Sequence, residues 1–382
     1  MDQAIHIIDP DGEVIIVLQN PNAPFAELTD GRTRDSLAYT PSGPSDEIQN
    51  SEESIKASRK EPIGTLKKKK KKKKVKEIGL KPKCRIVPNT SESFHLVSEK
   101  LEQTCFRVQV SAKHLILASS VFEKILTGGW KESITYLRKG SVEITADSWD
   151  ADALLIMLRI IHCQSHQVPR KLTLEMLAKV AVLADYYDCR EALLFFTDTW
   201  ITALDEIIPA TYSRDLILWL WVTWYFRLPA KFKEVTSKAM SLSNGWIDNL
   251  GLPIPVAILR SMNDKRQGAI AGLIARLDET RDGLQDGSKG CGFECSSIMY
   301  GALTKEMYLN NLLSLRPVAP FPDLSYRSLV QKVSSFRSPA WYSHKSYNPS
   351  YRHDCVDSTF ELLIGVLEDT IEGLDLKDSV TV

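Results

Sequence analysis

Most of the short motifs that mark a catalytic or nucleotide-binding protein are missing from this sequence. It contains no GxxxxGK[ST] or GxGxxG loop to cradle a phosphate, no GxSxG turn and no HExxH metalloprotease motif. Its seven histidines are dispersed, and no acid and base lie at a spacing that would place them together. We therefore expect a protein that is not an enzyme, with no catalytic residue and no cofactor-binding residue.

A disulfide framework is missing as well. Small secreted domains carry closely spaced, paired cysteines. No secretory signal is recognisable after Met1, because only a short apolar stretch follows Asp2. We expect an intracellular protein with reduced thiols, in the nucleus, the cytoplasm or both. The seven cysteines are odd in number and scattered: Cys84, Cys105, Cys163, Cys189, Cys291, Cys295 and Cys355.

No apolar run is long enough to cross a membrane. The most apolar stretch, 216–226, is far shorter than the roughly 20 residues that a spanning helix needs. It is typical of a buried helix, so we expect no membrane partner. The 48 basic and 48 acidic residues balance, so the chain as a whole is not expected to bind polyanions. Its 382 residues allow two or three domains.

Apolar periodicity predicts a small sheet in the first half of the chain. The β-branched run at 13–19 is typical of a buried strand, and we consider a hairpin between it and 5–8 across a Pro-Asp-Gly turn. Residues 106–111 and 141–145 alternate apolar and polar, the pattern of half-buried strands.

Helical spacing predicts that helices cover this sheet and continue to the end of the chain. Ser148 and Thr173 are expected N-caps. Pro229 and the stretch 251–255 are expected breaks, as is 282–283. The expected helices are 115–126, 148–161, 173–184, 190–201, several within 216–284, then 297–313 and 356–372, with a loop at 286–292.

A low-complexity insert interrupts the order between the first two strands. Residues 36–83 are rich in Ser, Glu, Pro, Gly and Lys and poor in aromatics, so we expect disorder there. The insert contains an unbroken lysine run at 67–74. The run is interpreted as a nuclear-import signal, as a nucleic-acid contact or as a solvated tract. Nucleic-acid binding is the least expected, because no aromatic or arginine residues are interleaved with it.

The chain resembles the BTB/POZ domain, especially its fungal members, over 5–25 and 94–201. The first strand runs into Asn-Pro-Asn-Ala-Pro-Phe at 20–25 as in that subset, although Glu13 stands where many members have aspartate. If that acid shapes the dimer core, dimerisation would be weaker here. The matching core residues are Val110, His114, Leu117, Ser119 or Ser120, and Phe122, followed by Ile125, Leu126 and the TGGWKES ending at 127–133.

The resemblance implies an α/β (α+β) BTB fold, a small sheet covered by helices, with a mostly helical C-terminal extension. We expect the first strands at 1–28, the lysine-rich insert at 29–92, the rest of the domain at 93–202 and the extension at 203–382. The extension also resembles that of the fungal proteins, in its paired cysteines, the PFPDLS stretch at 320–325 and His-Asp-Cys at 353–355.

One constellation in the extension has the residue types of a metal site. Cys291 and Cys295 with His353 and Cys355 make a Cys3His set, which suits tetrahedral zinc. Such a site would tie the glycine-rich loop to the last part of the chain. The alternative is that Cys291 and Cys295 lie one helical turn apart and pack as small apolar groups.

Two further features of the sequence can be interpreted. His114 is expected to anchor the junction between strand and first helix through a hydrogen bond of its ring, rather than to act as an acid or base. Trp130-Lys131-Glu132 has the apolar-x-Glu form of a short motif that contacts a cullin in BTB ubiquitin-ligase adaptors. A loop at the end of a helix is the simpler interpretation of these three residues.

The function we expect is protein–protein interaction, with self-association into a homodimer and recruitment of partner proteins. One alternative is a substrate adaptor for a cullin ubiquitin ligase, with cullin-3 as partner, but no kelch or similar repeat is present. Another is a nuclear regulator whose basic insert contacts nucleic acid, but no C2H2 zinc-finger spacing is present.

Overall fold

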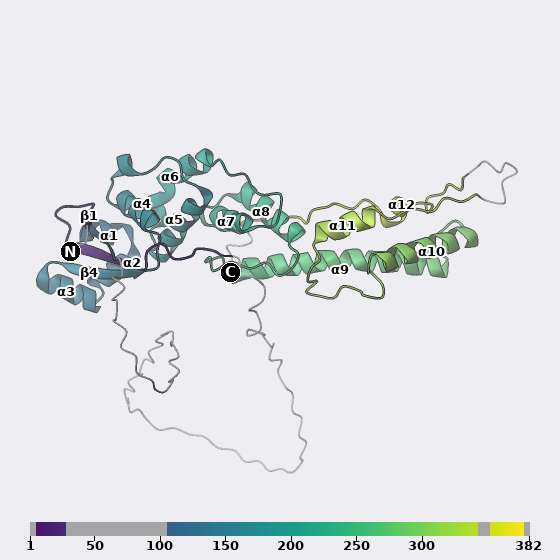
Figure 1. Cartoon of the computed structure of the whole chain (residues 1–382), viewed down its shortest axis with the longest axis horizontal. Helices are drawn as coiled ribbons and strands as arrows, with labels where there is room; N and C mark the ends of the chain where they lie inside the picture. The colour runs from purple at the N-terminus through teal and green to yellow at the C-terminus, as the bar shows by residue number, and fades with distance from the viewer. Residues whose placement is uncertain (1–4, 28–104, 343–351, 378–382) are drawn as a thin grey trace, which may run out of the picture. The chain divides into compact units, whose positions relative to one another are not determined.

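The computed structural model describes residues 5–27, 105–342 and 352–377 (Figure 1). The expected insert at 29–92 and its lysine run lie outside the described residues. Within the described part the fold is mixed α/β, as predicted, with one four-stranded sheet and twelve α-helices. None of these helices combines the length and apolar character that crossing a membrane requires.

The sheet has the order β1-β3-β2-β4. β2 runs antiparallel to β3 and parallel to β4, and β1 runs parallel to β3. The expected hairpin between 5–8 and 13–19 is therefore wrong, because β3 lies between them. The alternation of apolar and polar residues predicts which face of a strand is buried, but it does not predict which strand pairs with it. The strands are β1 Ile5–Ile7, β2 Val14–Gln19, β3 Phe106–Val110 and β4 Val142–Asp147.

Two short helices stand where one was expected at 115–126. Ser119 has an extended backbone between α1 and α2, and its hydroxyl accepts a hydrogen bond from the amide of Phe122. That hydroxyl also donates to the carbonyl of Tyr187, so a tertiary contact sets the break. The elements are α1 Ala112–Ala118, α2 Ser120–Thr127, α3 Lys131–Lys139, α4 Ala151–Ile161, the short 3-10 turn Ser165–Gln167, α5 Leu174–Tyr186 and α6 Arg190–Ala203.

The caps of α4 and α5 differ in how well they were predicted. Thr173 caps α5 as expected. Ser148 does not cap α4, because the helix begins at Ala151 and Ser148 lies two residues before the cap position. Its amide instead donates to the carbonyl of Gln19, and its φ is 65°. Asp150 is the cap, and its carboxylate accepts from the amide of Ala153. Asn22 supports the same helix end, since its side-chain oxygen accepts from the amide of Ala151.

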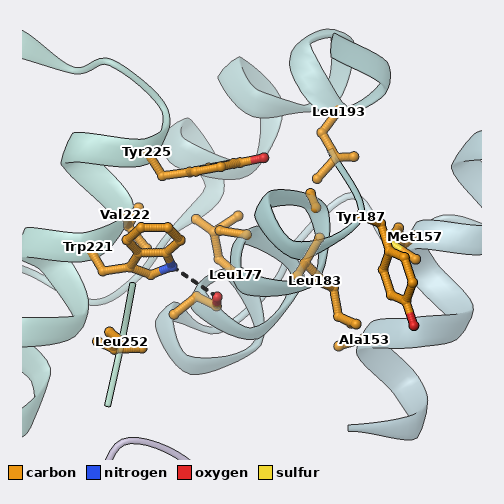
Figure 2. Close-up of a cluster of buried hydrophobic side chains, with 14 of the residues drawn as sticks. Ala153, Met157, Leu177, Leu183, Tyr187, Leu193, Trp221, Val222, Tyr225 and Leu252 are labelled. Atoms are coloured by element: carbon orange, nitrogen blue, oxygen red, sulfur yellow. Dashed lines mark hydrogen bonds between the residues drawn. The ribbon is translucent and has the colours of Figure 1, made fainter. Parts of the chain in front are cut away.

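The expected buried helix at 216–226 is confirmed as α7, which packs on α5. Figure 2 shows the core there, with the indole N–H of Trp221 pointing at the carbonyl of Ala178, 3.2 Å away. Around it lie Leu177, Val222 and Tyr225. This core is continuous with that of the sheet. The helices that follow are α7 Arg214–Tyr225, α8 Pro229–Leu242 and α9 Val256–Asp286, with the expected breaks at 229 and 251–255.

The extension forms a second core along the last part of α9. α10, α11 and α12 lie against α9 (Figure 1). α9 continues through the expected break at 282–283 to a left-handed Gly287. The expected helix at 356–372 is present only as the five-residue α12, because Gly365 ends it, and residues 370–376 run along α8 without helical structure. The bounds are α10 Phe293–Leu309, α11 Tyr326–Ser334 and α12 Phe360–Ile364.

A chain of ion pairs and hydrogen bonds links α4, α5 and α7 with residues 25 and 26. Lys179 contacts Asp150 at 2.8 Å and Glu175 at 2.9 Å. Arg214 contacts Glu175 at 2.9 Å and donates to the carbonyls of residues 25 and 26. Burial raises the pKa of Asp150, but the hydrogen bonds from Lys179 and a backbone amide outweigh it, so this pKa lies below its ordinary value.

Replacing Asp150 by asparagine should lower the free energy of unfolding at pH 7 by about 1–2 kcal/mol. A depressed carboxyl pKa adds stability above the ordinary value of 3.8, and that stability is lost as the pH falls through the lower folded pKa. The deficit of Asp150→Asn should therefore shrink in urea denaturation at about pH 3. Asp152→Asn, in the same helical turn and exposed, is the matched control. A deficit that stays constant from pH 7 to pH 3 would refute the assignment.

Candidate metal centre

Four side chains from two distant segments of the extension converge at one point. They are Cys291 from the loop before α10, Cys295 from the first turn of α10, and His353 and Cys355 from the segment before α12. Their ligand atoms, three sulfurs and one imidazole nitrogen, all lie within 4.8 Å of one another. The set suggested by the sequence is thus brought together whole.

Three of the six distances between these atoms lie close to the edges of a zinc tetrahedron. Bonds of about 2.3 Å to sulfur and about 2.05 Å to nitrogen put tetrahedral ligands about 3.8 Å apart for two sulfurs and about 3.6 Å apart for sulfur and nitrogen. Cys295 Sγ and Cys355 Sγ are 3.7 Å apart. His353 Nε2 lies 3.4 Å from Cys291 Sγ and 3.3 Å from Cys355 Sγ. A single ion at the centre would need only small shifts of these side chains.

Glycines shape the segment that supplies Cys291. Gly287 leaves α9 in a left-handed conformation, and Gly290 has a φ of 93°. A Cβ on Gly290 would lie 2.9 Å from the amide nitrogen of Ser296, so only glycine allows this approach. Cys291 therefore precedes α10, while Cys295 lies in its first turn. The alternative arrangement, with both cysteines one turn apart on a single helix, is not what the structure shows, because only Cys295 lies in α10.

A backbone bridge and an aromatic ring hold His353. Tyr342 and Arg352 form an antiparallel bridge, and the amide of His353 donates to the carbonyl of Trp341 at 2.9 Å. The imidazole stacks on the Trp341 ring, with centroids 4.6 Å apart and planes at 18°. This stacking fixes the plane of the imidazole and leaves Nε2 directed at the sulfurs.

Polar contacts outside the four ligands join the same two segments. The amide of Gly290 donates to the Asp357 carboxylate at 2.7 Å. The ammonium of Lys289 reaches the carbonyl of Leu363 at 3.4 Å and the hydroxyl of Thr280 at 3.2 Å. The two segments are therefore positioned by more than the cysteines and histidine, which favours a pre-formed ligand set. The sequence analysis missed Asp357 and Trp341. The only signal for Asp357 was its position two residues after Cys355, and Trp341 gave no signal.

The sulfurs differ in their surroundings. Cys295 is buried, His353 and Cys355 are half-buried, and Cys291 is exposed. Burial raises the pKa of the Cys295 thiol to about 12, because the thiolate is poorly solvated there. A bound divalent cation reverses this preference and takes up the thiolate. The exposed Cys291 side offers a path by which an ion can enter.

His114 does not anchor the strand–helix junction as expected. Its Nδ1 has no hydrogen-bond partner, and its ring stacks on His162 with centroids 4.9 Å apart. His162 is the anchor, since its Nε2 accepts from the amide of Ser111 and its Nδ1 contacts the carbonyl of Leu158 at 2.7 Å. Burial lowers the pKa of His162, which suits a neutral ring in this structural position.

Comparisons with protein-family models, with curated proteins and with solved structures find no match to this chain. The functional proposals therefore rest on the residues of this chain and on their geometry.

Proposed function

We propose that Cys291, Cys295, His353 and Cys355 bind one structural zinc ion, in a protein that acts by binding other proteins and not by catalysis. The observation that carries the metal proposal is the match of three ligand–ligand distances, 3.3 to 3.7 Å, to the edges of a tetrahedron. Thiolates with one imidazole select zinc among common divalent metals. Four protein ligands close the coordination sphere, which is the arrangement of structural sites and leaves no position for a substrate.

The ion would cross-link the extension where its own packing is limited. Cys295 and Cys355 are 60 positions apart, and α12 is only five residues long. A link that closes a long loop stabilises mainly by restricting the unfolded chain. Cys295 and Phe360 both belong to the extension core, so the ion would sit on the edge of that core. Metal binding and folding of this part are therefore expected to be coupled.

Elemental analysis of the full chain, purified without chelator, tests this proposal. We expect about one zinc per chain, because structural Cys3His sites retain their metal through purification. Cys163→Ser removes an exposed cysteine outside the set and should leave the zinc content unchanged. Protein that is folded by circular dichroism and contains no zinc, even after zinc is added and excess removed, would overturn the proposal.

Exposed apolar side chains support the protein-interaction proposal. Leu117 on α1 is 88% exposed and Leu137 on α3 is 77% exposed, and both lie in the segment that resembles BTB/POZ. Trp130 and Ile134 are exposed on the same stretch of chain. Large apolar side chains left in water favour association with another protein surface. We assign them to self-association into a homodimer, with partner proteins, cullin-3 among them, as further candidates.

Replacing Leu117 by glutamate should reduce self-association at least tenfold, because a charge at a dry interface is costly to bury. The measurement is the molar mass in size-exclusion chromatography with light scattering over a range of concentrations. Leu315→Glu, an equally drastic change at an exposed leucine of the extension, should keep the wild-type mass. A wild-type chain that stays monomeric at high micromolar concentration would refute self-association.

The cullin alternative has its own test. Trp130 is exposed at the start of α3, where its carbonyl accepts from the hydroxyl of Ser133. A pull-down with cullin-3 should be enriched over a Trp130→Ala control if this chain is an adaptor. Equal recovery with both chains removes that alternative and leaves self-association standing.

A further inference from the structure

Residues 370–376, called here the docked segment, lie along α8; the α8 residues that they contact, Lys233, Thr236, Ser237 and Ser241, are called here the α8 groove. Ile371, Leu374 and Leu376 of the docked segment are buried, while Glu372 and Asp375 are exposed. The segment is neither helix nor strand. Because it has no helix or strand of its own, its backbone is held by contacts with α8.

Three hydroxyls of α8 hydrogen-bond the backbone of the docked segment. Thr236 accepts from the amide of Leu374 at 2.9 Å, and Ser241 accepts from the amide of Ile371 at 2.7 Å. Ser237 donates to the carbonyl of Ile371 at 2.6 Å. These contacts recognise the main chain of an extended segment rather than particular side chains.

The helix itself orients two of these hydroxyls. Thr236 donates its proton to the carbonyl of Phe232 and Ser241 donates to that of Ser237, each four residues back in α8. Their remaining lone pairs must accept, and they face the amides of the docked segment. The α8 groove thus presents two pre-organised acceptors, which lowers the entropy lost on binding a peptide.

Gly373 and the acidic residues add selectivity. A Cβ on Gly373 would lie 1.9 Å from the carbonyl oxygen of Lys233, so the occupant needs glycine at this position. The ammonium of Lys233 contacts Glu372 at 2.8 Å and Asp375 at 3.6 Å. An open pocket of about 660 Å³ lies beside this contact, lined by α8 and by the docked segment together.

We propose that the α8 groove is a peptide-binding site, with the docked segment as its built-in, displaceable occupant. The ligand class is an extended segment of a partner protein with the pattern apolar–acidic–Gly–apolar–acidic–apolar. Displacement is feasible because residues 365, 366, 368 and 369, which connect the docked segment to α12, are exposed. The proposal is independent of the metal centre, since none of its residues is a ligand there.

The test uses the full chain and a fluorescent peptide of residues 368–377 in an anisotropy titration. Gly373→Val in the chain expels its own segment by the clash with Lys233 and leaves the groove intact. We expect this chain to bind the peptide at least tenfold more tightly than wild type, whose groove is occupied. The peptide with valine at position 373 should not bind. A folded Gly373→Val chain that shows no binding overturns the proposal.

Two controls keep the result interpretable. Gly245→Val makes the same substitution where a Cβ meets nothing, so it should behave as wild type. Adding Thr236→Val to Gly373→Val removes the acceptor for position 374 and should abolish the gained affinity. If Gly373→Val fails to fold, hydrogen exchange of the wild-type chain tests the proposal instead. The amide hydrogens of Ile371 and Leu374 should then exchange with solvent without global unfolding of the chain. Exchange only through global unfolding would overturn displaceability.

Discussion

Replacing Cys295 by serine should leave the purified chain without zinc and lower the free energy of unfolding of its extension by more than about 3 kcal/mol. Cys295 is the buried member of the four, and its sulfur lies 3.7 Å from that of Cys355. Serine keeps the shape but is a poor zinc ligand, so the ion loses its innermost contact. Zinc content and urea denaturation with a probe in the extension, such as Trp341 fluorescence, measure the two effects.

The comparison with chelated wild type separates a metal from simple packing. If zinc carries the stability, wild type stripped with chelator should unfold like Cys295→Ser, and added zinc should restore only wild type. Cys163→Ser should match wild type in both assays. A Cys295→Ser chain that keeps one zinc and wild-type stability would contradict the site. Equal stability of wild type with and without chelator would leave the cysteines as packed thiols.

Replacing Arg266 by methionine should destabilise the chain by about 3–5 kcal/mol. Arg266 on α9 is 1% exposed, and its guanidinium donates to the carbonyls of Ser243, Pro320, Phe321 and Leu324 at 2.8 to 3.2 Å. Methionine fills similar space and removes the cost of a buried charge. It also leaves four carbonyls without this donor, and unpaired buried acceptors outweigh that gain.

Arg260→Met is the matched control for this change, because Arg260 lies on the same helix and is exposed. It should alter stability by less than about 0.5 kcal/mol. Urea denaturation followed by circular dichroism measures both variants. An Arg266→Met chain as stable as the Arg260→Met chain would show that the link between α9 and residues 320–324 does not depend on the guanidinium.

Local patterns in the sequence were enough to predict the helices and strands whose formation depends mainly on their own residues. The strands at 14–19 and 106–110, the cap at Thr173 and the buried α7 follow from alternation, side-chain chemistry and apolar runs. The pairing of the strands could not be predicted from local patterns, because nearly a hundred residues separate β1 from its neighbour β3 in the sequence. Ser148 is not the cap because α4 begins two residues later than expected, with Asp150 as its cap.

The candidate site was predictable because its residue types are rare and chemically specific. Three cysteines and a histidine in two pairs point to metal even at unusual spacing. Arg266 and the docked segment gave no such signal. An arginine in a polar stretch of helix looks exposed, and residues 370–372 continue a helical pattern that Gly365 interrupts in the fold. Their roles arise from backbone groups far away in the sequence.

Zinc K-edge X-ray absorption of the full chain, purified without chelator, tests the central claim most directly. The account predicts about one zinc per chain, with three sulfur neighbours at about 2.3 Å and one nitrogen at about 2.05 Å. Cys295→Ser should lose this spectrum, and Cys163→Ser should keep it. A first shell of oxygen and nitrogen without sulfur, or folded protein that takes up no zinc, would contradict the account.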